Sequence, residues 1–282
     1  MNSLRRFLIL HKPQADAYET AHAVSNHLTS LGTDASVMPS TAPATDIYAS
    51  ASSADALVMV GGDGSIIGAA RKLNGLSIPI VGLNFGFVGF LAELPPSGWE
   101  QPLADIVAGK WLIEKHIALS WRILREGNPD LCVAEGCAIN DVIVSHGLVA
   151  RAVSLRITVD GIDFDGFRGD GVIISTPLGS TAYNASAGGP LTLPSMNAQL
   201  LTPVCPSFVR RFPHFVLPVQ SVTRMAVQRA TDDVVISVDG QENHPLRYGD
   251  ILEVQGAPDR FHMLVSSSDW YLRRLFERGI VS

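Results

Sequence analysis

A run of five apolar residues leads without a break into a glycine-rich loop, and this junction restricts the fold more than any other feature of the chain. The run is Ala56-Leu57-Val58-Met59-Val60, followed directly by Gly61-Gly62-Asp63-Gly64. A strand that is apolar on both faces is typical of a parallel sheet covered by helices on each side. Ligands of open α/β sheets bind beyond the carboxyl ends of the strands. The junction therefore predicts an α/β domain whose ligand site includes this loop.

Strand and helix patterns alternate around this junction through the first hundred residues. Strands are expected where short apolar runs occur, and helices where apolar residues recur every three or four positions. The expected strands are Phe7–Leu10, Ala35–Met38, Ala56–Val60 and Ile78–Leu83, and the expected helices are Gln14–Leu31 and Ser65–Leu73. This βαβ order predicts a Rossmann-like, parallel-sheet domain over residues 1–108.

From about Trp111 the apolar residues recur at every second position, which is typical of half-buried strands. Hairpin turns are expected at Asp160-Gly161 and Asp239-Gly240. The expected strands are Ala118–Leu124, Asp141–Val144, Ser154–Val159, Val172–Ser175, Val234–Val238 and Ile251–Val254, and Gly179–Gly189 could open a helix. We expect a mostly β domain over residues 109–264. The amphipathic stretch Asp269–Arg278 predicts that residues 265–282 form a helix that docks back on the first domain.

Charge and cysteine content exclude several classes of protein. The formal net charge is -6 and the pI is near 5.7, whereas a nucleic-acid-binding protein usually carries a basic face. Cys132, Cys137 and Cys205 have neither zinc-site spacing nor the even number of a disulfide framework. The most apolar longer stretch, Ile78–Ala92, is interrupted by proline and glycines and would not span a membrane. We expect a cytoplasmic protein without a nucleic-acid or membrane partner.

A carboxylate in the middle of the glycine-rich loop indicates chemistry rather than simple phosphate binding. Glycines let the backbone approach phosphates closely, but the negative charge of Asp63 would repel them. Asp63 is explained as the proton acceptor for an attacking hydroxyl, or as a contact to a metal ion that offsets phosphate charge. The alternative is a tight turn in which Asp63 caps the following helix. The tetrapeptide alone leaves these interpretations open.

The chain has neither of the common nucleotide-binding fingerprints. A P-loop requires a lysine after its glycines, but the four lysines, Lys12, Lys72, Lys110 and Lys115, all lie outside glycine-rich loops. The glycines of residues 82–89 do not have the spacing of a dinucleotide fingerprint either. Much of the phosphate charge must therefore be neutralised by a divalent metal ion, with Mg²⁺ as the expected ion. No protein ligands are assigned to it.

Two further motifs carry polar groups suited to a nucleoside. Asn140-Asp141 precedes an apolar strand, and an amide beside a carboxylate can grip vicinal hydroxyls, although such a pair is more often a plain turn. The segment from Gly169 to Pro190 reads GDGVIISTPLGSTAYNASAGGP. Its small hydroxyl residues could contact a flat base, and Tyr183 offers a stacking face.

These motifs, together with Asn84-x-Gly86-x-x-Gly89-Phe90-Leu91, strongly resemble the NAD kinase family over residues 56–245. The diglycine-aspartate loop is shared with lipid kinases and phosphofructokinases, and the GSTAY segment narrows the resemblance to NAD kinases. The resemblance implies transfer of the terminal phosphoryl group of ATP to the 2′-hydroxyl of the adenosine ribose of NAD. It also implies NAD bound between the two domains of a homodimer or homotetramer. A lipid kinase and a catalytically silent NAD-binding regulator are the alternatives.

The resemblance also assigns roles to residues. Asp63 would accept the proton, with Gly64 beside it, Asn140 and Asp141 would hold ribose hydroxyls, and Asp170 would meet the nicotinamide amide. The remaining expected contacts with NAD are Arg151, Arg168, Gln241 and the adenine-side wall of Thr181, Ala182, Tyr183, Asn184, Ala185 and Ser186, with Phe90, Gly61 and Gly62 as weaker candidates. This chain departs from the commonest family pattern at Ser65, Phe85, Phe87, Asp141 and Leu178, where Asp141 replaces the usual glutamate.

Overall fold

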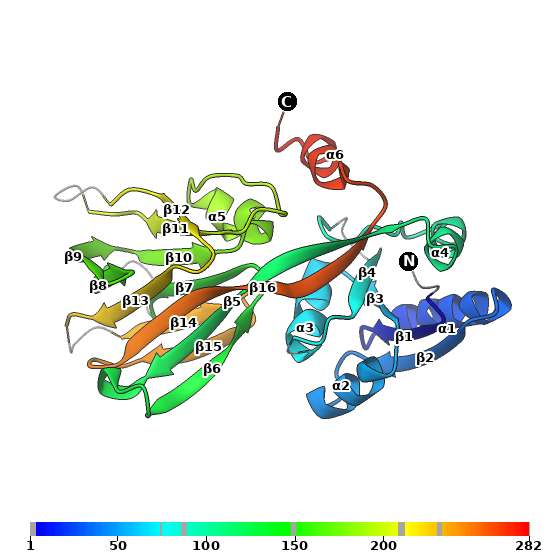
Figure 1. Ribbon diagram of the computed structural model, residues 1–282, viewed down its shortest axis with the longest axis horizontal. Coiled ribbons are helices and arrows are strands. Elements are labelled where there is room, and N and C mark those ends of the chain that lie inside the picture. The colour runs from blue at the N-terminus through cyan, green and yellow to red at the C-terminus, as the bar shows by residue number, and fades with distance from the viewer. Residues whose placement is uncertain are drawn as a thin grey trace. The chain divides into compact units, whose positions relative to one another are not determined.

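The computed structural model describes residues 4–73, 75–85, 89–147, 151–207, 212–229 and 233–281, which form two compact units (Figure 1). The first unit comprises Met1–Lys115 and Arg260–Ser282, and the second comprises His116–Asp259. Two long strands, β5 (Leu112–Leu124) and β16 (Ile251–Val265), contribute to both units. The three-part division with boundaries at residues 108 and 264 stays a prediction.

The first unit is built on parallel strands in the order β2-β1-β3-β4, and the last residues of β16 pair with β4, also in parallel. Its elements are β1 (Arg6–His11), α1 (Ala15–Ser30), β2 (Asp34–Pro39), α2 (Ala44–Ser52), β3 (Ala56–Gly61), α3 (Asp63–Leu73), β4 (Pro79–Asn84), α4 (Glu100–Val107) and α6 (Trp270–Glu277). Strands β3 and β4 end side by side, because Gly61 pairs with Asn84. The glycine-rich loop therefore lies at the carboxyl edge of this sheet, as the apolar run before it predicts.

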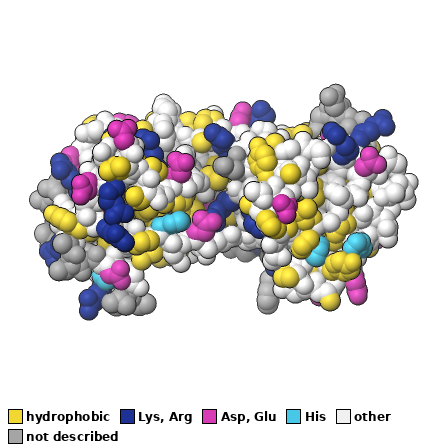
Figure 2. Space-filling view, turned by 90° about the horizontal axis from the view of Figure 1, so that it is seen from below, with side chains coloured by type: hydrophobic (Ala, Val, Ile, Leu, Met, Phe, Trp, Pro, Cys, Tyr) yellow, Lys and Arg dark blue, Asp and Glu magenta, His cyan; other side chains and the backbone are white. Residues whose placement is uncertain are grey.

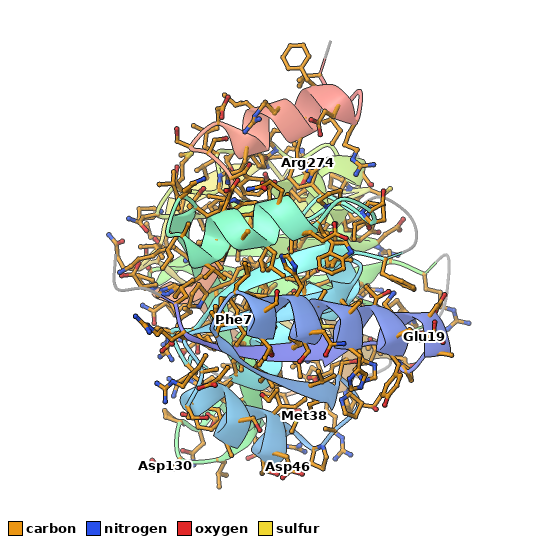
Figure 3. The ribbon with its side chains drawn as sticks, turned by 90° about the vertical axis from the view of Figure 1, so that its right-hand side faces the viewer. Phe7, Glu19, Met38, Asp46, Asp130 and Arg274 are labelled. Atoms are coloured by element: carbon orange, nitrogen blue, oxygen red, sulfur yellow. The ribbon has the colours of Figure 1, made fainter. Side chains whose placement is uncertain are left out.

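Burial in the first unit follows the sequence pattern. Every residue of β3 is buried, as a continuous apolar run requires when both faces of the sheet are covered. Helix α1 buries Ala17, Ala21, Val24 and Leu28, which share one helical face and belong to the same core as β1 residues such as Phe7. Figure 3 marks these elements with Phe7 on β1, Glu19 on α1 and Met38 on β2.

The second unit contains antiparallel strands arranged in two layers. One layer has the order β12-β11-β10-β7-β14-β15, and the other includes β9-β8-β13-β16 with β5 and β6. The elements are β6 (Cys132–Ala138), β7 (Asp141–His146), β8 (Val153–Val159), β9 (Ile162–Gly169), β10 (Gly171–Ser175), α5 (Tyr183–Ser186), β11 (Ala198–Val204), β12 (Phe215–Pro218), β13 (Val222–Val227), β14 (Val234–Val238) and β15 (Glu242–Leu246), with 3-10 turns at Arg125–Gly127 and Leu178–Thr181. Alternate residues of both layers, such as Val142 and Leu155, form one core between them.

The expected fold class is confirmed, with an α/β unit, an antiparallel β unit and a C-terminal helix. Sequence patterns did not indicate α2 and α4, because each buries only two residues and so carries little periodic signal. The segment Gly179–Gly189 contains the one-turn helix α5, after the 3-10 turn at Leu178–Thr181. Among the residues that the structure describes, no helix is long and apolar enough to cross a membrane.

Candidate functional site

The glycine-rich loop connects β3 to α3 by a tight turn. Helix α3 begins at Asp63, and the backbone N–H groups of Ser65 and Ile66 donate to the Gly62 carbonyl at 2.9 and 3.2 Å. A Cβ on Gly61 would lie 2.7 Å from the Ser65 hydroxyl oxygen, so a side chain at position 61 would force the helix start to move. The loop geometry thus depends on this glycine.

The Asp63 carboxylate is held by a second segment of the chain. Its Oδ2 accepts the Phe90 N–H at 2.5 Å, and its Oδ1 accepts the Leu91 N–H at 2.9 Å. Gly89, whose N–H points to the Asn84 side-chain oxygen at 3.5 Å, packs so closely on the carboxylate that any side chain there would overlap it. Each carboxylate oxygen has two acceptor sites, so each retains one for a substrate hydroxyl. Gly86 and Phe87 of the same motif lie outside the described residues, and Phe85 packs against the core.

Lys12 lies beside the glycine-rich loop, although the two are about fifty residues apart in the sequence. It directly follows β1, the neighbour of β3, and its Nζ is 4.0 Å from the point that a Cβ on Gly62 would occupy. Lys72 instead donates to the carbonyls of Ser40 and Ala42, and Lys110 pairs with Asp105 at 2.8 Å. The sequence shows a lysine directly after the expected strand Phe7–Leu10. This position indicates a place beside the glycine-rich loop only when the order of the strands is known.

In the second unit, one carboxylate organises the turn that carries Asn140 and Asp141. The backbone N–H groups of Ile139, Asn140 and Asp141 donate to the Asp239 carboxylate at 2.7–3.1 Å. The Thr176 hydroxyl donates to the Ile139 carbonyl at 2.7 Å. These bonds join β7, the residues after β10, and the turn between β14 and β15. Sequence reasoning identified Asp239 only as a hairpin residue, because its partners lie about a hundred positions earlier.

Asp141 is almost completely buried, with 4% of its surface exposed. Burial, and then the negative charge of Asp239, raise the pKa of Asp141 to about 7. Near neutral pH this carboxyl group is therefore partly protonated, and it can donate as well as accept a hydrogen bond. The pair Asn140-Asp141 thus places a buried titratable group beside an amide, and its role in binding hydroxyls stays a prediction.

The GSTAY segment is anchored by buried polar residues that leave its outer side chains accessible. Gly179 packs directly on the Asn140 backbone and donates to the Thr176 hydroxyl oxygen at 3.0 Å. The fully buried Asn184 amide donates to the Ser180 and Pro190 carbonyls and accepts from the Thr202 hydroxyl. The residues around it are at least partly exposed, namely Thr181, Ala182, Tyr183, Ala185 and Ser186. The buried Asn184 therefore fixes the conformation of the segment, and the Tyr183 ring, which is 45% exposed, is accessible to a ligand.

Arg168 and Asp170 lie at the opposite end of β10 from Asn140. Gly171 pairs with Ser145 and Ser175 pairs with Asp141, and the next residue, Thr176, donates to the Asn140 carbonyl. The six steps from Asp170 to Thr176 therefore separate the two groups by about 20 Å at 3.3 Å per residue. Arg151 is near the first group, since it precedes β8, whose Val153 pairs with Gly169. A hydrogen bond to Asp170 raises the pKa of the Cys205 thiol. One copy of the second unit thus carries two separate groups of candidate residues.

The candidate residues belong to both units. Asp63, Gly61, Gly62, Gly64 and Phe90 lie in the first unit, around the end of β3. The second unit brings Asn140, Asp141 and the start of the GSTAY segment together, and Gln241 follows Asp239 in the same turn region, exposed. Arg151, Arg168 and Asp170 form the separate group at the other end of β10.

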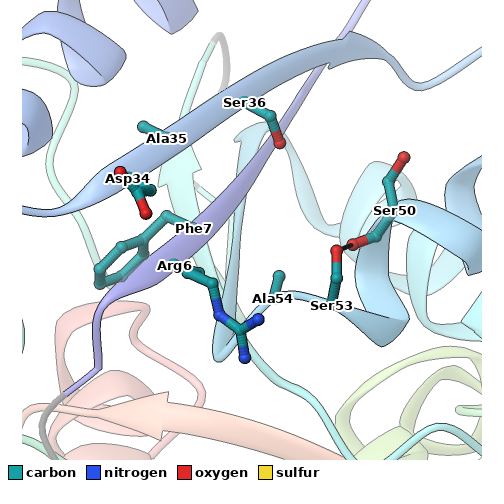
Figure 4. Close-up of a pocket in the computed structure, with 8 residues that line it drawn as sticks. All are labelled: Arg6, Phe7, Asp34, Ala35, Ser36, Ser50, Ser53 and Ala54. Carbon is teal, nitrogen blue, oxygen red and sulfur yellow. Dashed lines mark hydrogen bonds between the residues drawn. The ribbon is translucent and has the colours of Figure 1, made fainter.

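A surface hollow in the first unit does not coincide with these residues. It is lined by residues at the amino ends of β1 and β2 and at the end of α2, including Arg6, Asp34, Ser50 and Ser53 (Figure 4). Ligands of open α/β sheets bind at the carboxyl edge instead. The hollow is therefore not the candidate active site.

Clusters of metal ligands and charged patches are two further features that bear on function. Among the described residues, no group of three or more His, Cys, Asp or Glu side chains could hold a metal ion. Figure 2 shows one face, on which basic, acidic and hydrophobic side chains are interspersed. This face lacks the dense basic patch that is typical of nucleic-acid binding.

Two protein-family models together match most of the chain. Residues 9–111 match the ATP-NAD kinase N-terminal domain, and residues 139–266 match the ATP-NAD kinase C-terminal domain. An NAD kinase of Nitratidesulfovibrio vulgaris strain DP4 is 36% identical over 282 residues, which is 100% of this chain and 93% of the relative. An NAD kinase of Lawsonia intracellularis is 32% identical over 100% of this chain and 98% of its own length.

Two solved structures share the fold. A yeast NADH kinase complexed with NADH superposes with a TM-score of 0.85 at 24% identity, covering 100% of this chain and 89% of its own. An NAD kinase from Archaeoglobus fulgidus in complex with ATP gives a TM-score of 0.76 at 24% identity, covering 97% and 98% respectively. At this identity the likeness concerns the fold.

Proposed function

The chain belongs to the ATP-NAD kinase family and phosphorylates NAD with ATP, and on this premise we propose how its residues carry out the reaction. The terminal phosphoryl group of ATP is transferred to the 2′-hydroxyl of the adenosine ribose, which gives NADP. Asp63 is the base that accepts the hydroxyl proton. This proposal is carried by one observation above all, a carboxylate held at the carboxyl edge of a parallel sheet with acceptor capacity to spare.

Phosphoryl transfer suits such a site because it needs mainly positioning and charge stabilisation from the protein. The N–H groups of Phe90 and Leu91 orient the Asp63 carboxylate before substrate arrives. A base in this position contributes roughly 10²–10⁴-fold to the rate. Gly61, Gly62 and Gly64 leave Asp63 as the only side chain of the loop, so phosphate groups can approach its backbone.

A divalent metal ion, Mg²⁺, fits this site as an ion carried chiefly by the phosphates of ATP. Mg²⁺ in kinases is commonly held by one or two carboxylates together with substrate phosphates and water. The Asp63 carboxylate is the one side-chain anion of the glycine-rich loop. When bound, the ion would neutralise charge on the transferring phosphoryl group.

The second unit supplies the groups proposed to bind NAD. Asn140 and Asp141 hold ribose hydroxyls, and Gln241 and the accessible residues of the segment 181–186 contact the adenosine half, while the buried Asn184 holds that segment in place. Arg151, Arg168 and Asp170 contact the nicotinamide half. Their separation from Asn140 by about 20 Å supports a homodimer or homotetramer, in which a second copy brings its own Asp170 to the ligand. We further propose that the enzyme is cytoplasmic and acts without a membrane or nucleic-acid partner.

The direct test incubates the purified full chain with NAD, ATP and magnesium and detects NADP with an NADP-specific dehydrogenase. Metal-dependent formation of NADP is expected. NAD binding without NADP would indicate a catalytically silent regulator, and phosphorylation of a lipid supplied in place of NAD in a parallel reaction would indicate a lipid kinase. Either result would contradict the proposed reaction.

Lys12 is proposed to supply the positive charge that faces the phosphates of ATP at the glycine-rich loop. Lys12→Met is expected to raise the KM for ATP by about 10- to 100-fold, the size of one lost hydrogen bond to a charged group. The KM for NAD should change less than twofold. Initial rates at saturating NAD measure the effect, with Lys110→Met as the control, because Lys110 pairs with Asp105 in the same unit. An unchanged KM for ATP in Lys12→Met would remove this assignment.

A further inference from the structure

The C-terminal helix α6 contacts the backbone of the segment that holds Asp63. Arg278 donates to the Gly89 carbonyl at 2.6 Å, and Arg274, which Figure 3 labels on α6, donates to the Ala92 carbonyl at 2.8 Å. Between these two carbonyls lie Phe90 and Leu91, whose N–H groups bind the Asp63 carboxylate. The carbonyls of this turn are thus held by α6, and its amides hold Asp63.

An ion pair reinforces one end of this contact. Arg274 lies 3.5 Å from the Glu93 carboxylate, and the two side chains are 17% and 6% exposed. The other Glu93 oxygen accepts the Ser266 hydroxyl at 2.7 Å. Because the pair is largely shielded from solvent, removing one charge leaves the other poorly compensated, so the arrangement is sensitive to substitution.

Aromatic side chains attach α6 to the same segment and to the body of the first unit. The Phe90 ring meets the rings of Trp270 and Tyr271 edge to face, with centroids 6.1 and 5.3 Å apart. The Trp270 indole N–H donates to the Glu114 carboxylate at 2.6 Å, and Glu114 belongs to β5. Helix α6 is therefore anchored by its own contacts with β5, independently of its two arginines.

We propose that Arg274 and Arg278 are positioning residues for phosphoryl transfer, because they hold the turn 89–91 at the distance from which its amides orient the Asp63 carboxylate. The inference rests on the proposed role of Asp63. It adds that the catalytic geometry depends on a helix about two hundred residues further along the chain. Neither arginine contacts Asp63, so each acts through the turn.

Helix α6 could instead only stabilise the first unit, and the two cases predict different measurements. A stabilising contact lowers the temperature of unfolding and leaves kcat per folded molecule unchanged. A positioning contact lowers kcat at temperatures where the variant is fully folded. A displacement of about 1 Å at a catalytic group costs up to about 100-fold in rate.

The test compares Arg274→Gln/Arg278→Gln with Arg273→Gln in the full chain. Arg273 lies on the same helix, but its contacts are with Ser267 and Asp269 rather than with the turn. The double variant is expected to lose about 10- to 100-fold in kcat, with the KM values for NAD and ATP within about twofold of the wild type. Arg273→Gln should retain wild-type kcat. The variant Arg274→Lys/Arg278→Gln, which keeps a positive charge at position 274, should recover part of the kcat that the double glutamine variant loses.

Hydrogen exchange provides a readout that does not depend on activity. The Phe90 and Leu91 amides are protected by Asp63, so a peptide covering residues 89–92 should exchange faster in the double variant and unchanged in Arg273→Gln. Wild-type kcat and unchanged exchange in a folded double variant would overturn the inference while leaving the proposed function intact. A wild-type protein that forms no NADP would instead contradict the proposed function, whatever the exchange experiment shows.

Discussion

Asp63→Asn is expected to lower kcat by about 10²–10⁴-fold, which corresponds to about 3–5 kcal/mol of transition-state stabilisation. Asparagine has nearly the same shape, but its amide cannot accept the proton of the attacking hydroxyl. It also offers one acceptor oxygen in place of two, so one of the bonds from Phe90 and Leu91 is lost. NAD should still bind, because its proposed contacts lie mostly in the second unit. Steady-state rates and a binding titration with NAD measure the two effects.

A matched control for this substitution exists in the same unit. Asp46 lies in the first turn of α2, as Asp63 lies in the first turn of α3, so Asp46→Asn removes the same charge from another helix start. This control should retain wild-type turnover. If Asp63→Asn turned over at the wild-type rate, the proton would have to be accepted by another group, and the assignment of Asp63 as base would be wrong.

The local elements of this protein could be predicted from sequence because each leaves a periodic pattern. The unbroken apolar run of β3 indicates burial on both faces, and the alternation of Val142 and Val144 indicates one buried face of β7. The position of the glycine-rich loop followed from the same reasoning, since a loop after a buried parallel strand lies at the ligand-binding edge.

The hydrogen bonds that hold Asp63 and the Asn140-Asp141 turn in place could not be predicted in this way. Asp63 binds amides 27 and 28 positions away, Asp239 binds amides about a hundred positions away, and Arg278 reaches Gly89 over 189 positions. A backbone amide is present at every residue except proline, so no residue type indicates which amide will be bound. Lys12 became meaningful only when β1 was found beside β3.

Asp141 is a buried acidic residue whose protonation links the stability of the fold to pH. The carboxyl group is buried near Asp239, and its pKa is raised to about 7. In the unfolded chain an aspartate has a pKa of about 3.9. Between these values the folded state binds a proton that the unfolded state has lost, so the free energy of unfolding falls as pH rises from about 4 to 7. The loss from this residue amounts to at most about 4 kcal/mol.

Asp141→Asn should therefore stabilise the protein at pH 8, by up to about 4 kcal/mol relative to the wild type, and should have little effect at pH 4. Denaturant unfolding at several pH values measures the difference, with Asp160→Asn as the control. Asp160 occupies the other Asp-Gly hairpin turn of the second unit, where its carboxylate is exposed and accepts the Val222 N–H at 2.8 Å. If the free energies of unfolding of the wild type and of Asp141→Asn differed by the same amount at every pH from 4 to 8, the raised pKa of Asp141 would be contradicted.

The same substitution tests why the chain keeps a carboxyl group whose ionisation destabilises the fold. If Asp141 holds ribose hydroxyls, Asp141→Asn should weaken NAD binding at pH 8 by about 10- to 100-fold, since a hydrogen bond to a charged acceptor contributes about 1.5–3 kcal/mol. Stability and affinity would then change in opposite directions at one residue. A site that trades stability for binding behaves in this way, whereas a plain turn would gain stability with no loss of affinity. Measuring both quantities on one variant distinguishes these cases, because the gain in stability reports burial and the loss of affinity reports contact with the ligand.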